Sequence, residues 1–141
     1  MCTLLNESNP YAIKWRHVIS EEILFQQISI GVGLKVWGID TYGHVYLRYN
    51  VELKNNYCGE YWSRIKFEEL NDNDTVKFEQ ISVGDGTVWA VSKANELYFR
   101  ANISKMFPEG TAWIKVDNFI KYVTVNHKNE VLCPKDYAIF K

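Results

Sequence analysis

Two segments decide the fold: FQQISIGVG at residues 25–33 and FEQISVGDG at residues 78–86. They share Phe, Gln, Ile, Ser and two glycines in the same order. Further matches follow in both copies: VWGI at 36–39 with VWAV at 88–91, and VYLR at 45–48 with LYFR at 97–100. So many ordered identities at nearly equal spacing indicate an internal repeat.

Three tryptophans set the period of this repeat. Trp15, Trp62 and Trp113 each begin a short pattern of the form Trp-x-x-apolar, and they lie about 50 residues apart, as expected for four-stranded propeller blades. The chain therefore divides into an N-terminal segment (1–12) and one repeat region (13–141). The predicted units within that region are 15–61, 62–112 and a partial third unit at 113–141.

The third unit is harder to align than the other two. Residues 123–125 (Val-Thr-Val) match either the Ile-Ser-Val strand or the Trp-Ala-Val strand of the repeat. Residues 129–132 (Asn-Glu-Val-Leu) echo residues 95–98 (Asn-Glu-Leu-Tyr). Only part of a third blade is expected.

Within each unit, apolar and polar residues alternate over four to six positions and are interrupted by Gly or Asn at turn positions, which predicts short antiparallel strands. The fold class is therefore all-β, with two complete four-stranded blades and one partial blade. Such sheets carry apolar residues on both faces and must stack on one another. We expect Trp37 and Trp89 to lie between stacked sheets.

The composition of the chain argues against some classes of partner and of location. The chain has 141 residues, of which 47% are hydrophobic and 15% aromatic, and its formal net charge is −1. A balanced charge argues against a nucleic-acid partner, and the lack of a long apolar run argues against an integral membrane segment. No export signal is evident, and the three cysteines, Cys2, Cys58 and Cys133, are read as reduced thiols. A cytoplasmic location is expected, with secretion by a route not visible in the chain as the alternative.

The motifs do not indicate catalysis. The two Gly-x-Gly pairs, at residues 31–33 and 84–86, lack the flanking residues of a phosphate-binding loop. The three histidines have no ligand partners at metal-binding spacing, and the repeated serines, Ser29 and Ser82, favour a structural role. We expect no metal, no cofactor and no enzymatic activity.

Six residues are candidates for ligand binding. Arg48 and Arg100 recur at the end of the same strand, where a guanidinium can bind an anionic sugar or a carboxylate. The alternative is a structural arginine that donates to carbonyls of the loop before the next Trp. The other candidates lie near turns and strand ends, where they could contact a sugar: Tyr42, His44, Tyr49 and Tyr61.

The chain resembles the tectonin β-propeller repeat family. The resemblance covers roughly residues 15–133 and includes a closing Pro-x-Gly-x-x-Trp pattern, present at residues 108–113 and, without the Pro, at residues 58–62. The structural positions of this pattern are Trp15, Trp37, Trp62, Trp89, Trp113, Gly59 and Gly110. The long loops between the first two strands and the eroded third unit depart from the pattern and put a regular closed ring in doubt.

The resemblance implies a binding propeller. The family includes lectins that bind glycans or bacterial surface saccharides, and intracellular proteins of autophagy and membrane trafficking. We therefore expect a non-catalytic module that recognises carbohydrate, or alternatively an intracellular scaffold that binds proteins. Because propellers have about four to eight blades, we also expect self-association or membership of a longer propeller.

Overall fold

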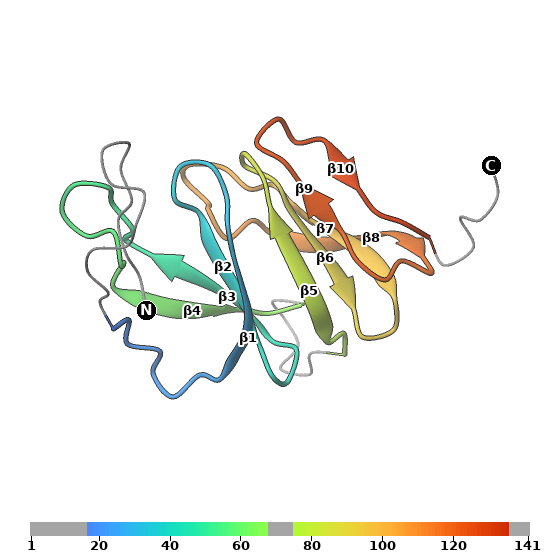
Figure 1. Cartoon of the computed structure of the whole chain (residues 1–141), viewed down its shortest axis with the longest axis horizontal. Helices are drawn as coiled ribbons and strands as arrows, with labels where there is room; N and C mark the ends of the chain where they lie inside the picture. Colours follow the sequence, from blue (N-terminus) through green and yellow to red (C-terminus); the bar gives the residue numbers. More distant parts are fainter. Residues whose placement is uncertain (1–16, 68–74, 136–141) are drawn as a thin grey trace, which may run out of the picture.

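The computed structural model describes residues 17–67 and 75–135, in which all regular structure is β (Figure 1). Two four-stranded antiparallel sheets and one two-stranded sheet follow one another along the chain. The first sheet contains β1 (Phe25–Ile30), β2 (Val36–Asp40), β3 (Val45–Tyr49) and β4 (Tyr61–Ile65); the second contains β5 (Phe78–Val83), β6 (Val88–Ser92), β7 (Glu96–Ala101) and β8 (Ala112–Asn118); the third pairs β9 (Thr124–Val125) with β10 (Val131–Leu132). The predicted all-β class, with two complete four-stranded units and a partial third, is confirmed.

The sheets are displaced by one strand from the units read in the sequence. Trp62 lies in β4 and Trp113 in β8, each the last strand of its sheet. The tryptophan period is therefore real, but it marks the outer strand of each sheet rather than its start. Trp15, predicted to open a first strand, lies outside the described residues, and residues 17–24 form no strand.

Side-chain hydrogen bonds join each sheet to the next at the inner strands. The Gln27 side chain donates to the Ile81 carbonyl at 2.9 Å and accepts from the Ile81 amide at 2.8 Å. The Ser29 hydroxyl accepts from the Val83 amide at 3.1 Å. The repeated Gln-x-Ser of the sequence is thus an inter-sheet connector, which gives Ser29 the structural role expected for it.

The same connector settles the alignment of the third unit. Gln80 bonds the amide and carbonyl of Val123, at 2.8 and 2.7 Å, and the Ser82 hydroxyl accepts from the Val125 amide at 3.0 Å. Residues 123–125 therefore correspond to the Ile-Ser-Val strand, and of the two readings left open by the sequence the first is correct. The echo between residues 129–132 and 95–98 is misleading, because β10 pairs with β9 as a second strand rather than a third.

Two hairpin turns show why Gly and Asn recur between strands. Gly43, between β2 and β3, has φ of 89°, and Asn95, between β6 and β7, has φ of 60°. Few residue types accept a left-handed backbone without strain. The turn chemistry read from the sequence is confirmed at both positions.

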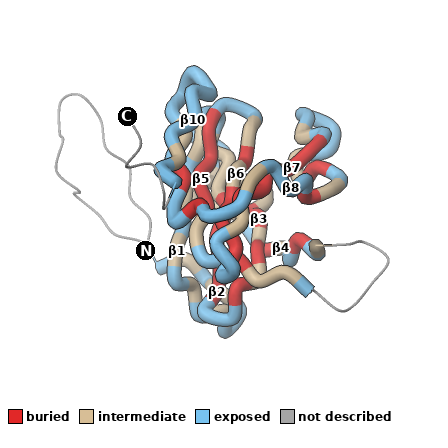
Figure 2. Tube along the Cα trace, turned by 90° about the vertical axis from the view of Figure 1, so that its right-hand side faces the viewer, coloured by how far each residue is buried: buried red, intermediate tan, exposed pale blue. Residues whose placement is uncertain are grey.

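The main core lies between the first and second sheets, and most buried residues fall there (Figure 2). Trp37 is 1% exposed and its ring lies 6.5 Å from that of Trp113, so its predicted position between sheets is confirmed. Trp89 holds the equivalent position one sheet later, yet it is only partly buried. The third sheet has two strands and covers only part of the face that carries Trp89.

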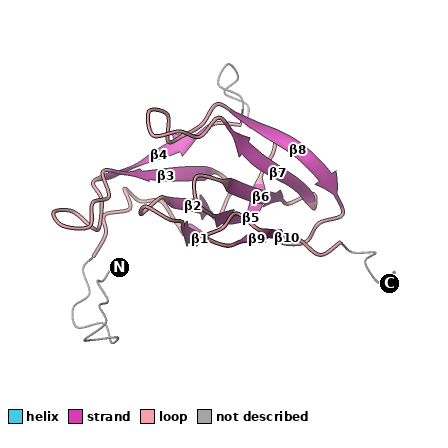
Figure 3. Cartoon of the chain, turned by 90° about the horizontal axis from the view of Figure 1, so that it is seen from above, coloured by secondary structure: helices cyan, strands magenta, loops and turns pink. Residues whose placement is uncertain are grey.

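The sheets lie closer together at their inner strands than at their outer strands. Seen from above, the inner strands β1, β5 and β9 lie near one another, while the outer strands β4 and β8 are spread along the opposite side (Figure 3). This arrangement places the loop between β7 and β8 beside the outer part of the first sheet, where the Tyr49 hydroxyl donates to Glu109.

Candidate functional site

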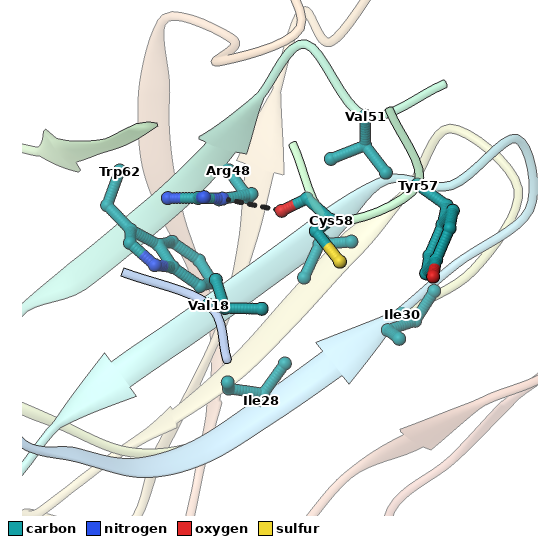
Figure 4. A pocket seen from close by; sticks show the side chains of 9 residues that line it. Val18, Ile28, Ile30, Arg48, Val51, Tyr57, Cys58 and Trp62 are labelled. Atoms are coloured by element: carbon teal, nitrogen blue, oxygen red, sulfur yellow. Dashed lines mark hydrogen bonds between the residues drawn. The ribbon is translucent and has the colours of Figure 1, made fainter. Parts of the chain in front are cut away.

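Arg48 and Arg100 are buried and bind backbone carbonyls. Arg48, 6% exposed, donates from Nε to the Cys58 carbonyl at 3.1 Å (Figure 4) and from a terminal nitrogen to the Gly59 carbonyl at 3.2 Å. Arg100, 4% exposed, makes the same two bonds to the carbonyls of Glu109 and Gly110, at 2.8 and 3.4 Å. These are the contacts of the structural alternative: each arginine anchors the loop that leads into the outer strand.

The outer tryptophans complete these two anchors. The guanidinium carbon of Arg48 lies 5.4 Å from the ring centre of Trp62, and that of Arg100 lies 5.5 Å from that of Trp113, which is cation–π geometry. Burial lowers the pKa of Arg48 from its ordinary value. The residues of the repeat pattern therefore act together in holding the loop.

Gly59 and Gly110 are required by the same loops. Their φ values are 68° and 63°, and a Cβ added to Gly110 would collide with the carbonyl oxygen of Ala101. Their assignment as structural positions of the repeat agrees with this backbone geometry.

Tyr42 and His44 lie at the opposite end of β3 from Tyr49. Tyr42 is 69% exposed, and its ring centre lies 6.2 Å from that of His44. His44 Nδ1 is 3.0 Å from the Asp40 carboxylate, and its Nε2 is 2.9 Å from the Lys77 ammonium group. Since ammonium only donates, His44 accepts at Nε2 and donates from Nδ1. The chain of bonds fastens the β2–β3 turn to the segment before β5.

Asp40 organises this turn. Its carboxylate accepts from the amides of Tyr42 and His44 at 2.9 and 2.8 Å and from the Tyr46 hydroxyl at 3.3 Å. Burial acts to raise the pKa of Asp40, but the bonds from His44 and Tyr42 outweigh it, and the pKa is lowered from its ordinary value of 3.8. The carboxylate is therefore stabilised by the fold.

A depressed pKa has a predictable effect on stability. Asp40 should contribute its full stabilisation above pH 3.8 and lose it as the pH falls through its lower folded value. We expect Asp40→Ser to remove this part of the acid dependence while keeping the turn, because Ser92 accepts the equivalent amide bond in the second sheet. Urea unfolding between pH 5 and 2 measures the difference, and an unchanged acid dependence in the variant would contradict the assignment.

Tyr49 and Tyr61 stand beside a groove between the first sheet and the β7–β8 loop. Their rings are stacked, with centres 5.2 Å apart and planes inclined by 7°, and the Tyr49 hydroxyl donates to the Glu109 carboxylate at 3.2 Å. Burial and the nearby Glu109 raise the pKa of Tyr49 to about 12, which keeps the hydroxyl protonated. The groove has a volume of about 340 Å³ and is lined by Tyr49, Ser63, Arg64, Ile65, Lys66, Arg100 and Glu109.

The six predicted ligand residues thus do not form one site. Tyr49 and Arg100 line the groove and Tyr61 stacks beside it, Arg48 lies within the first sheet, and Tyr42 and His44 occupy the far turn. Sequence reasoning missed the polar residues contributed by other strands: Ser63 and Arg64 on β4, Lys66 after it, and Glu109 in the β7–β8 loop. They fall outside the repeated positions, so no periodic signal pointed to them.

The cysteines are not all free thiols. Cys58 is disulfide-bonded and Cys133 is free, while Cys2 lies outside the described residues. The expectation of three reduced thiols is therefore wrong at Cys58, which lies in the loop that Arg48 anchors. The cysteines therefore do not favour a cytoplasmic location, which stays a prediction.

In residues 17–67 and 75–135, no group of three or more His, Cys, Asp or Glu side chains is arranged to hold a metal ion. Over the same ranges, no helix has the length and apolar character needed to cross a bilayer.

Comparison with known proteins agrees with the geometry of the second sheet. Residues 87–116 match a family model described as a propeller, a stretch that includes β6, β7 and most of β8. No curated protein matches the chain. The second sheet therefore carries a propeller repeat, a type of unit typical of binding and interaction modules.

Proposed function

We propose that this protein is a non-catalytic recognition module that binds carbohydrate in the groove between the first sheet and the β7–β8 loop. The observation that carries the proposal is that Tyr49 of β3, Ser63 of β4 and Glu109 of the β7–β8 loop line one polar groove of about 340 Å³. A carboxylate and two hydroxyls offer the acceptors and donors that sugar hydroxyls need. The half-exposed ring of Tyr61 beside the groove offers an apolar face for stacking.

The basic residues of the groove indicate which sugars fit. Arg64 and Lys66 are exposed side chains that line it, together with one carboxylate, that of Glu109. Cationic groups favour an anionic partner, so the proposal extends to acidic glycans such as those carrying carboxylate or sulfate groups. The disulfide at Cys58 favours an oxidising compartment, which suits a lectin that reaches the cell exterior.

Glycan-array binding of the wild-type chain and of Glu109→Gln tests this proposal. We expect the wild type to bind a subset of acidic glycans and the variant to lose at least tenfold in affinity. The sugar hydroxyls that donate to the Glu109 carboxylate would meet a neutral amide, which accepts weaker bonds. Thermal unfolding of the variant should be nearly unchanged. Glu79→Gln, an exposed carboxylate on β5, is the matched control.

The two negative outcomes have different meanings. A blank array with folded wild-type protein would contradict carbohydrate binding altogether. Sugar binding that survives Glu109→Gln with full affinity would instead move the site away from the groove.

A second candidate function is a protein-binding scaffold, such as one in autophagy or vesicle trafficking. The observation that favours it is the number of large apolar side chains left exposed on the outer faces, including Ile30 and Leu132 at 63% and 64%. A cytoplasmic location belongs with this candidate. Tight binding of a defined protein partner, together with a blank glycan array, would favour it over the lectin.

A further inference from the structure

In the part of the chain that the structure describes, the first sheet has an open apolar face on the side away from the second sheet. Gln27 and Ser29 of β1 point toward the second sheet, so the alternating residues Ile28 and Ile30 point away from it. They are 50% and 63% exposed. Together with Val18, Val51 and Trp62 they line a cavity of about 120 Å³, shown in Figure 4.

The equivalent face of the second sheet is buried by a neighbouring sheet. Ile81 and Val83 occupy the positions of Ile28 and Ile30 in the repeat, and they are only 1% and 6% exposed. They belong to the core that also contains Trp37 of the first sheet. The open face of the first sheet is therefore the counterpart of a face that the chain itself buries against a Trp-bearing sheet.

The other end of the stack carries the complementary surface. Leu132 pairs with Thr124 across β9 and β10, as Trp37 pairs with Ser29 across β1 and β2. Because Trp37 and Ser29 face the following sheet, Leu132 and Thr124 face the place where a following sheet would lie. Leu132 is 64% exposed.

The inner-strand hydrogen bonds point to the same pairing. In the junction within the chain, the Ser29 hydroxyl accepts from the amide of Val83. The residue equivalent to Val83 in the first sheet is Ile30, on the edge strand β1. The residue equivalent to Ser29 in the third unit is Thr124, whose hydroxyl can accept in the same way.

We propose that a second copy of this chain docks head to tail, with its β9–β10 end packed on the open face of the first sheet. Leu132 of one copy takes the place that Trp37 holds in the internal junction, against Ile28 and Ile30 of the other copy. The contact joins two different surfaces, so each added copy leaves both kinds of end available until the assembly closes on itself. Because the strands already fan around a common inner edge (Figure 3), repetition of the contact leads to a closed ring.

Sedimentation velocity over a range of concentrations tests the proposal with two end-blocking variants. Ile30→Glu places a charge on the open face, and Leu132→Glu places one on the β9–β10 end. We expect the wild type to form a discrete oligomer and each variant alone to associate at least tenfold more weakly. An equimolar mixture of the two variants should form a one-to-one pair, because one intact end of each kind remains.

Controls separate this contact from nonspecific association. Met106→Glu changes a side chain that is 82% exposed in the β7–β8 loop, and this variant should assemble like the wild type. Circular dichroism should show both end-blocking variants folded, since both residues are exposed.

Three results would overturn the proposal. They are a monomeric wild type at tens of micromolar, full association of either single variant, or a mixture of variants that stays monomeric. Full association of Leu132→Glu alone would indicate that two open faces pair with each other instead.

Discussion

Replacement of Trp37 by alanine is expected to lower the free energy of unfolding by about 3–5 kcal/mol, the usual cost of removing a large buried aromatic side chain. Trp37 is 1% exposed and contacts Trp113 across the junction of the two complete sheets. Its loss would open a cavity in the core that both sheets share. Urea unfolding followed by far-ultraviolet circular dichroism measures the change.

Trp89→Ala is the matched control, because the repeat places Trp89 at the same position one sheet later. Trp89 is only partly buried beneath the two-stranded third unit, so we expect a loss of only about 1–2 kcal/mol, in line with the smaller apolar area that is buried. The measurement uses dilute protein, in which copies are not assembled. Equal losses in the two variants would contradict the difference in packing.

The repeat explains why so much of the fold could be predicted. Each sheet is built from local strand and turn signals that recur, so the ordered matches around Phe25 and Phe78, with the Trp-x-x-apolar patterns, located the eight strands of the two complete sheets. They did not show which four strands form each sheet. The connectors Gln27 and Ser29 also belong to the repeated positions. Their partner in the next sheet could not be read from one copy, but the recurrence itself indicated a structural role.

The sequence predicted the length of the repeat better than the strand at which each sheet begins. Trp62 and Trp113 are the most conspicuous residues of the repeat, yet they lie on the last strand of each sheet. There each one contacts the buried arginine that anchors the preceding loop. In the third unit, short strands without a Trp left two alignments equally good. Only the bonds from Gln80 and Ser82 to β9 distinguish them.

The candidate groove was the least predictable feature, because it depends on contacts between sheets. Tyr49 was identified from its place at a strand end, but Glu109 lies 60 positions later in the chain. Nothing in the local pattern around either residue specifies the other. The packing of the first sheet against the β7–β8 loop brings them together, and that packing follows from Trp37 and the other buried residues between the sheets.

Replacement of the buried arginines, Arg48 and Arg100, is expected to cause the second large loss of stability. Arg100→Ala is expected to cost about 2–4 kcal/mol, because the carbonyls of Glu109 and Gly110 would lose charge-assisted bonds in a buried setting. Arg48→Ala should cost a similar amount for the same reason at Cys58 and Gly59. Thermal and urea unfolding of both variants provides the measurement.

Arg100→Lys is the informative companion to these variants. A lysine keeps the charge but cannot place two donors on adjacent carbonyls in the fixed geometry of a guanidinium. We therefore expect Arg100→Lys to recover less than half of the stability lost in Arg100→Ala. If both variants instead fold with wild-type stability and lose sugar binding, the guanidinium would be a ligand contact, and the loop anchor assigned to it would be wrong. If the variants are less stable but still bind sugar while folded, Arg100 supports the groove from beneath. Glu109 and Ser63 are then the groups that contact the sugar.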